Sequence, residues 1–417
     1  MRIENPSRQG LLSRWTLLSA LLLLPSLVAG GFERATLGLR YGAAGTIDLL
    51  GYWGGSRLLW EGENPYDSDR LRVLQQQISG HPLECVPGCP HPPLPVIVYN
   101  PPWLSVWLAP IAALPFRVAV VGWLFLNLAL VLSAATLLWK VFDERRLPVV
   151  GAWIGAVAFI PTLSNLQMGQ MGGLLVFGLA GFVFFTSRGR DFPAGMCLAL
   201  TTIKPHVVYL PWIAVVCWVV LERRWRVFAG VAAVLLPSLG AVALVSPRAL
   251  VGYQSILANP PLHLRTPTLG GVSRLLLFHD APRIQYLPAL VAGSALAVYL
   301  LWKRPRIDWK TAMGPLLLVS VTTAAYGWSY DHVVLLVPFL EVVNRVLRDR
   351  GVDRSRTRLL IAITVIVALA MVVQNRSNVS DDAYFWVPWA MGGIYYLALF
   401  SHGATVRPRS DAILGGV

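Results

Sequence analysis

Long apolar segments separated by short basic loops are the feature that most constrains this chain. Hydrophobic residues make up 55% of its 417 residues and charged residues only 13%, and the mean hydropathy is +0.58. A water-soluble domain of this size carries more charge, and apolar runs long enough to cross a bilayer recur from end to end. We therefore predict an all-α polytopic membrane protein, a single integral membrane domain over residues 1–417.

About twelve membrane spans fit this pattern. We expect them near residues 15–31, 118–139, 149–163, 171–187, 192–203, 207–221, 227–245, 286–302, 311–328, 333–346, 359–373 and 386–401. The first has no clear cleavage site, so we interpret it as a retained signal anchor. Segment 100–115 is also apolar, but a crossing there would invert the charge pattern. We interpret it as an interfacial or re-entrant element with Trp103 and Trp107 at the lipid headgroups.

The distribution of basic residues predicts the orientation in the membrane. The net charge is +14, from 35 basic and 21 acidic residues. Lys and Arg cluster in short loops, which face the cytoplasm, whereas long loops count little. Both termini are then cytoplasmic in a plasma-membrane protein. Segments 32–117 and 246–285 become extracytoplasmic loops, the first with interfacial helices. We expect membrane lipids, and no nucleic acid, as partners.

Asp48 is the most informative polar residue on the outer side. It opens a predicted short helix that ends near Gly62, and at 3.6 residues per turn it shares one stripe with Tyr52 and Ser56. The residue could be an interfacial acid that faces water. In a partly desolvated cavity its pKa would instead rise toward the range of a general base.

Other polar side chains also fall at the outer ends of predicted spans. Lys204, followed by Pro205 and His206, either reaches toward the headgroups or contacts a phosphate. Asp331 and His332 form either a structural hydrogen bond or an anion contact in which the carboxylate sets the histidine tautomer. Polar groups that converge on one face of a membrane protein indicate a wet cavity or a binding site.

Three further patterns leave alternatives open. The glycine-rich turn around Gln170 suits either amides that bind hydroxyls or close helix packing. Arg265, in the long segment 246–285, belongs either to a lid over an anionic substrate or to a basic loop near anionic lipid. Cys85 and Cys89 favour a loop disulfide over a zinc site. We expect no metal and no cofactor, and the chain has no nucleotide-binding motif.

Several short motifs together resemble a known family. They are Asp48 with Tyr52-Trp53, the run Gly62-Glu-Asn-Pro-Tyr66-Asp67, Tyr99-Asn-Pro-Pro, Gly169-Gln170 and Lys204-Pro205. In this order they resemble the GT-C superfamily of membrane glycosyltransferases, and more closely glycosyltransferase family 87, to about residue 338. The resemblance implies a GT-C-like helical bundle and an inverting transferase with an extracytoplasmic active site.

The resemblance also implies the substrates and the role of Asp48, and the other roles given below are our own expectations from the residues. The donor is expected to be a sugar, typically mannose, on a polyprenyl phosphate, and the acceptor a lipid-linked or exported glycan. Asp48 is the expected base. We expect Lys204, His332 and Arg265 to contact the donor phosphate, and the remaining candidates to bind substrate: Tyr52, Tyr66, Asp67, Tyr99, Gln170, His206 and Asp331. The alternatives are a flippase or transporter of lipid-linked sugars, or a non-catalytic scaffold.

Overall fold

The structure is a computed structural model that describes residues 29–41, 47–85, 93–143, 147–277, 281–349, 354–377 and 379–399. These residues form helices and no strands, as predicted. Most of the predicted span 15–31 lies outside the described residues. The described segment 29–41, which begins near its end, is helical. Each of the other predicted spans coincides with one helix or with two consecutive helices.

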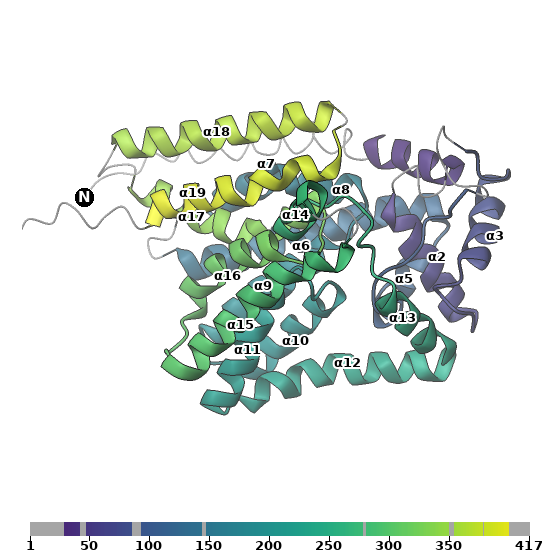
Figure 1. Cartoon of the computed structure of the whole chain (residues 1–417), viewed down its shortest axis with the longest axis horizontal. Helices are drawn as coiled ribbons and strands as arrows, with labels where there is room; N and C mark the ends of the chain where they lie inside the picture. The colour runs from purple at the N-terminus through teal and green to yellow at the C-terminus, as the bar shows by residue number, and fades with distance from the viewer. Residues whose placement is uncertain are drawn as a thin grey trace, which may run out of the picture.

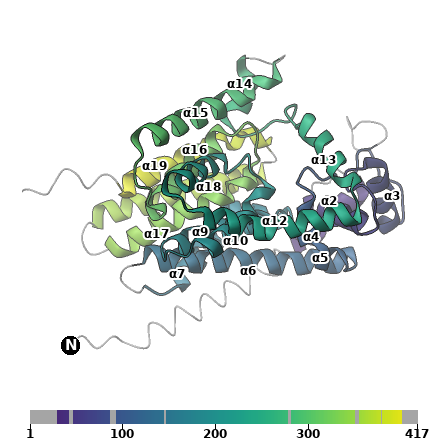
Figure 2. The ribbon, with the colours of Figure 1, turned by 90° about the horizontal axis from the view of Figure 1, so that it is seen from below.

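The helices that correspond to predicted spans build the body of the molecule. They are α6 (Phe116–Phe142), α7 (Val150–Ala158), α8 (Ile160–Gln167), α9 (Gly172–Thr186), α10 (Asp191–Ala199) with η2 (Leu200–Ile203), α11 (Tyr209–Glu222), α12 (Trp225–Val245), α15 (Tyr286–Lys303), α16 (Trp309–Thr323), α17 (Leu336–Asp349), α18 (Arg354–Arg376) and α19 (Trp386–Leu399). Figure 1 shows them stacked side by side, with α18 along one outer edge. Turned by 90°, α14 and α15 lie on one face and α6 and α7 on the opposite one (Figure 2).

Four of the described helices are long and apolar enough to cross a membrane: 116–142, 225–245, 282–303 and 357–374. Other predicted spans form shorter or broken helices. Residues 149–163 divide into α7 and α8 at Phe159, because Pro161 lacks the N–H that would continue the helical ladder. The protein is thus membrane-integral, and its core contains helices shorter than a bilayer is thick.

The segments predicted to be extracytoplasmic form short helices. They are α2 (Asp48–Trp60), α3 (Ser68–Ser79), α4 (Trp103–Trp107), α5 (Ala109–Ala112), α13 (Arg248–Ala258), α14 (Leu269–Leu277), η3 (Pro282–Gln285), η4 (Ser329–Leu335) and η5 (Asp381–Phe385). Segment 100–115 therefore contains two helices too short to cross a bilayer. Trp103 and Trp107 are half-buried and donate hydrogen bonds to Thr202 and Ser238, at 3.0 and 2.9 Å.

The helix that begins at Asp48 is enclosed by protein. It ends at Trp60, and Gly62 follows with a φ of 79°, so the predicted stop is confirmed. Residues Leu49 to Ser56 are buried, and α3, α4, α5, α6 and α12 pack around the helix. We expected a helix on the membrane surface. That position relative to the membrane stays a prediction. Within the protein, the three glycines of α2 allow close packing against neighbouring segments, which fixes Asp48 relative to the bundle.

Candidate functional site

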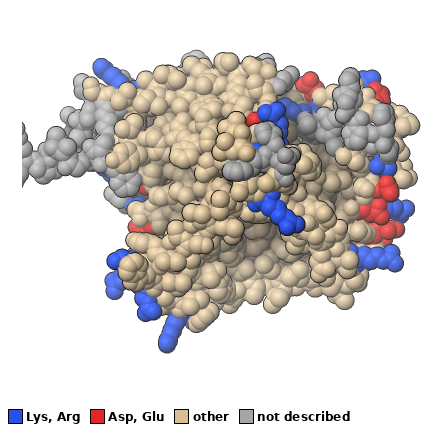
Figure 3. All heavy atoms as spheres, in the orientation of Figure 1, with Lys and Arg blue, Asp and Glu red and all other residues tan. Residues whose placement is uncertain are grey.

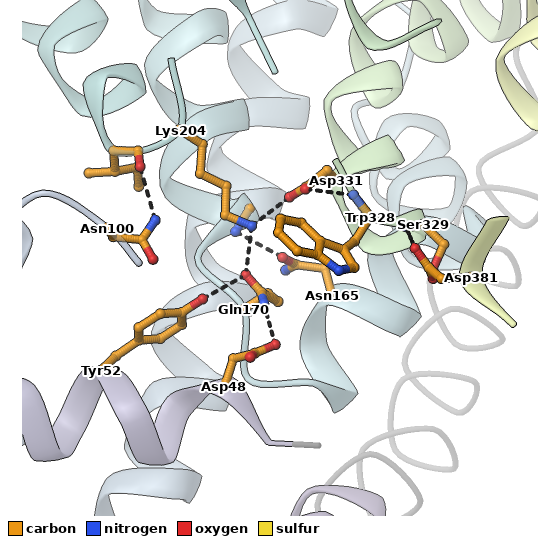
Figure 4. A network of polar contacts seen from close by, with 12 residues as sticks. Asp48, Tyr52, Asn100, Asn165, Gln170, Lys204, Trp328, Ser329, Asp331 and Asp381 are labelled. Carbon is orange, nitrogen blue, oxygen red and sulfur yellow. Dashed lines mark hydrogen bonds and ion pairs between the residues drawn. The ribbon is translucent and has the colours of Figure 1, made fainter. Parts of the chain in front are cut away.

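Asp48 meets the turn between α8 and α9. Its backbone N–H donates to the carbonyl oxygen of Met168 at 3.1 Å. Its carboxylate accepts a short hydrogen bond from the side-chain amide of Gln170. The start of α2 and this turn are far apart in sequence, and Figure 4 shows their side chains facing one another.

Gln170 joins Asp48 to two other polar side chains. Its Oε1 accepts a hydrogen bond from the Tyr52 hydroxyl at 3.0 Å and another from Lys204 Nζ at 2.9 Å, while its Nε2 donates to Asp48. Lys204 Nζ in turn lies 2.6 Å from Asp331 Oδ1. We call these five residues, Asp48, Tyr52, Gln170, Lys204 and Asp331, the Asp48 network (Figure 4).

The ion pair in this network is buried. The side chains of Lys204 and Asp331 are each 5% exposed, and Lys204 Nζ also lies 4.8 Å from the centre of the Tyr330 ring. Removing one partner of such a pair leaves an uncompensated buried charge, at a cost of about 3–5 kcal/mol. Asp331 is fixed in its own turn, because its Oδ2 accepts the Trp328 N–H at 3.0 Å.

The turn that carries Gln170 is held by the helices on either side of it. The Gln170 N–H donates to the Asn165 carbonyl oxygen at 3.0 Å, and its own carbonyl oxygen accepts from Asn127. Trp123 donates from Nε1 to the Gly169 carbonyl oxygen at 2.9 Å. The glycines of this turn approach protein atoms, such as Val333 beside Gly172. The glycines of this turn are closely packed, and its Gln170 amide also accepts a hydrogen bond from a hydroxyl, that of Tyr52.

A cavity of about 1210 Å³ opens beside the network. Its polar end includes Asp48, Tyr52, Lys204 and His206, and the rest of its wall is largely apolar. That wall follows one side of α11 and α15 and is completed by α13 and the extended segment 94–101. Figure 3 shows the face bordered by α13 and α15 hollowed near its middle, with Lys and Arg mostly at its edges.

Burial sets the ionisation of the acid in this cavity. Loss of solvent raises the pKa of Asp48, and the nearby charge of Lys204 and the hydrogen bond from Gln170 oppose that rise. Burial also lowers the pKa of His206 to about 4, so that this ring is neutral at neutral pH. His206 Nε2 is buried without a hydrogen-bond partner, and the ring lies 4.3 Å from that of Tyr326.

Two predicted substrate residues hold the walls of the cavity instead of lining it. The Tyr66 hydroxyl donates to the Asn100 carbonyl oxygen at 2.7 Å, and its ring stacks on Tyr253 of α13. Asp67 caps α3 by accepting the N–H groups of residues 69 and 70, both at 3.0 Å. Tyr99, in contrast, lines the cavity and is 39% exposed.

His332 and Arg265 lie outside the cavity lining, although both were expected to contact phosphate. His332 is buried, its Nδ1 has no hydrogen-bond partner, and burial lowers its pKa to about 4. Asp331 bonds to Lys204 and not to His332 Nδ1. Arg265 is 60% exposed and pairs with Asp382 at 3.1 Å. These contacts do not bring either residue into the Asp48 network.

The cysteine loop is described only in part. Cys85 takes part in a disulfide, whereas Cys89 lies outside the described residues, so the pairing of the two stays a prediction. Within the part of the chain that the structure describes, no group of three His, Cys, Asp or Glu side chains could hold a metal ion.

Sequence reasoning missed several residues of the site. Asn100 donates to the Ile203 carbonyl oxygen at 2.9 Å and so joins the extended segment to the residue before Lys204. Its place in the Tyr99-Asn-Pro-Pro run was a usable signal. Trp328 and Tyr253 line the cavity, but nothing in their local sequence distinguishes them from other interfacial aromatic residues.

Comparison with known proteins gives one match. The sequence model of glycosyltransferase family 87 matches residues 98–322, which is more than half of the chain. The matched range includes Gln170, Lys204 and His206, and it ends before Asp331 and begins after Asp48. No curated protein and no solved structure matches this chain.

Proposed function

Because this chain belongs to glycosyltransferase family 87, we propose that it is an inverting, polyprenyl-phosphate-dependent transferase with Asp48 as its general base. The donor sugar is a hexose, mannose by the family resemblance, and the acceptor is a lipid-linked or exported glycan. One observation carries this proposal: the cavity joins the half-buried carboxylate of Asp48 to a long apolar wall. Transfer from a lipid-linked sugar needs both, the carboxylate for the reaction and the apolar wall for the lipid.

The reaction requires one proton transfer and one displacement. Asp48 takes the proton from an acceptor hydroxyl while that oxygen forms a bond to the anomeric carbon of the donor. The bond from this carbon to the phosphate oxygen breaks, and the lipid phosphate leaves with the electron pair. Attack from the side opposite the phosphate inverts the anomeric configuration. Burial raises the pKa of Asp48, and a carboxylate with a higher pKa is a stronger base.

The lining of the cavity supports a place for each part of the donor. The isoprenoid chain fits the apolar side of α15 that lines the cavity. Together with η3, α15 forms a helical segment, 282–303, that is apolar and long enough to cross a bilayer. The phosphate is then next to Lys204. An ammonium group has three N–H donors, of which Gln170 and Asp331 take two. The third can stabilise the leaving phosphate, with His206 beside it.

The basic loops support the location of the reaction. With these loops in the cytoplasm, the Asp48 network lies at the outer ends of the spans, in a plasma-membrane protein. Donor and acceptor then approach from the outer leaflet. This placement agrees with a substrate that is tethered to lipid rather than dissolved in the cytoplasm.

The test is a transfer assay with purified protein, radiolabelled polyprenyl-phosphate mannose and a lipid extract. The wild-type protein should produce a new labelled glycolipid. Asp48→Asn removes the base and should lower the rate by about 10²–10⁴-fold, the usual contribution of general base catalysis. Asp69→Asn is the matched control, because Asp69 is 82% exposed on α3.

Two outcomes contradict the proposal. A near-wild-type rate in Asp48→Asn removes this residue from the role of base. A wild-type protein that moves labelled lipid across a vesicle membrane, but never transfers the sugar, is a flippase instead.

A further inference from the structure

The side chain of Gln170 has no spare acceptor for a substrate. Its Oε1 already accepts two hydrogen bonds, from Tyr52 and Lys204, and the residue is 1% exposed. It does not line the cavity, whereas Asp48, Tyr52 and Lys204 do. The expected role of Gln170 as a substrate ligand therefore has no support from its contacts.

Lys204 fixes which way the Gln170 amide points. An ammonium group only donates hydrogen bonds, so the amide atom that faces Lys204 must be the oxygen. The amide nitrogen must then face Asp48, where the short contact lies. An amide N–H toward Asp48 favours the ionised carboxylate over the protonated acid. The buried partner of Lys204, Asp331, holds the ammonium in place.

The backbone of Gln170 is held as firmly as its side chain. Its N–H and its carbonyl oxygen are both hydrogen-bonded, to Asn165 and Asn127 respectively. The residue before it, Gly169, is bonded by Trp123. Two fixed backbone atoms and a fixed amide leave Gln170 one orientation toward Asp48.

From these contacts we propose that Gln170 is a positioning residue, which aims its amide N–H at Asp48 and keeps that carboxylate ready to accept a proton. This inference rests on the proposed role of Asp48 as the base. The charges of Lys204 and Asp331 influence the pKa of Asp48. The charge of Asp48 in turn raises the pKa of Tyr52, Tyr99 and Tyr330. Of these, only Lys204 is positively charged and favours the ionised form of Asp48.

The experiment replaces Gln170 and follows the protonation of Asp48. Gln170→Met keeps a similar volume and removes the hydrogen bond. Loss of a hydrogen bond to the charged carboxylate should raise the pKa of Asp48 by about one to two units. Because the base works only when deprotonated, the acidic limb of the kcat/KM profile should move to higher pH by that amount. Activity should recover at the alkaline end.

Gln170→Glu is the second variant, in case the first does not fold. It has nearly the same shape and keeps the bonds from Tyr52 and Lys204, but it places a carboxyl oxygen against Asp48. Two adjacent carboxyl groups share one proton, which raises the pKa of the pair. A purely structural role for Gln170 predicts that this variant behaves like the wild type.

A second readout does not depend on transfer. Dicyclohexylcarbodiimide modifies protonated carboxyl groups in apolar surroundings, and mass spectrometry can measure its rate of reaction with Asp48 as a function of pH. The midpoint should move to higher pH in both Gln170 variants. Gln374→Met is the control, because it removes one side-chain hydrogen bond, from Trp386, outside the cavity lining.

An unchanged labelling midpoint in folded Gln170→Met, with an unchanged acidic limb, would overturn the inference. A lower rate at every pH with no shift would also do so, because it assigns Gln170 a packing role. Failure of the proposed function looks different: the wild type transfers no sugar, or Asp48→Asn stays active, whatever the labelling of Asp48 shows.

Discussion

The conformation of Gly169 brings the turn that carries Gln170 close to Asp48 on α2. Its φ is 64°, in the left-handed region that residues with a Cβ avoid at a cost of about 1–2 kcal/mol. A Cβ on this residue would lie 2.7 Å from Leu49 Cβ, next to Asp48 on α2. The conformation lets the turn approach α2 closely enough for Gln170 to reach Asp48.

Gly169→Ala should therefore impair both stability and catalysis. We expect a loss of about 1–3 kcal/mol of stability. We also expect turnover to fall by about 10²-fold, because a 1 Å displacement of a catalytic group has effects of that size. Gly189→Ala is the matched control, since its φ is 67° but nothing lies within 4 Å of its added Cβ. Thermal unfolding and the transfer assay on both variants measure the difference. Equal activity of the two would show that the approach of the turn to α2 is unimportant.

At the scale of elements, the crossing of α10 and α12 determines where Lys204 lies. A Cβ on Gly195 of α10 would lie 1.9 Å from the Val227 carbonyl oxygen, and one on Gly230 would lie 2.1 Å from that of Phe192. The two helix backbones are thus in direct contact, as small residues allow in membrane proteins. Since α10 continues through η2 into Lys204, this contact anchors the cation of the site.

Gly195→Leu should push the two helices apart. We expect a loss of about 1–3 kcal/mol or more from overpacking, together with weaker transfer activity, because Lys204 moves with α10. Gly240→Leu on α12 is the control: nothing lies within 4 Å of a Cβ at this position. Thermal unfolding followed by tryptophan fluorescence, in one detergent, compares the two. A smaller effect for Gly195→Leu than for Gly240→Leu would contradict the packing argument.

At the scale of the whole molecule, the function depends on which side of the membrane the cavity faces. Ser380 is exposed next to Asp381, whose carboxylate accepts hydrogen bonds from Ser329 in the turn that leads to Asp331. Ser187 is exposed in the short loop between α9 and α10, next to Arg188 and Arg190. The charge pattern predicts that these two loops lie on opposite sides.

Cysteine labelling in intact cells tests this topology. A membrane-impermeant maleimide should modify Ser380→Cys from outside and should reach Ser187→Cys only after the membrane is permeabilised. The unmodified chain gives the background from its native cysteines. The reverse pattern would place the Asp48 network on the cytoplasmic side and would rule out an outer-leaflet donor.

Local sequence was enough to predict most of the helices. Apolar runs bounded by basic loops, Pro and Gly coincide with helices such as α6, α12 and α15, because each such run must satisfy its own backbone hydrogen bonds in lipid. The stop at Gly62 was also readable. The break between α7 and α8 was not predicted, although Pro161 was visible, since a helix can also accommodate a proline by kinking.

The sequence indicated some residues of the site but not the contacts between them. Asp48, Lys204 and Asp331 were singled out as isolated charges at the ends of apolar segments, where charge is expensive and therefore informative. Their connections were not predicted: Asp331 was assigned to its neighbour His332, whereas it pairs with Lys204. Adjacent positions in a sequence say little about which side chains face each other once a turn is formed.

By itself the sequence determined that this is a helical membrane protein, because apolar length, helical period and basic loops are local properties. It also indicated three charged residues of the site, Asp48, Lys204 and Asp331. The tertiary structure alone decided that Gln170 lies between Lys204 and Asp48, with an apolar cavity beside them. Those contacts join residues separated by 122 and 34 positions. Residues so far apart in sequence come into contact only when the packing of the whole bundle offsets the loss of conformational entropy in the chain between them.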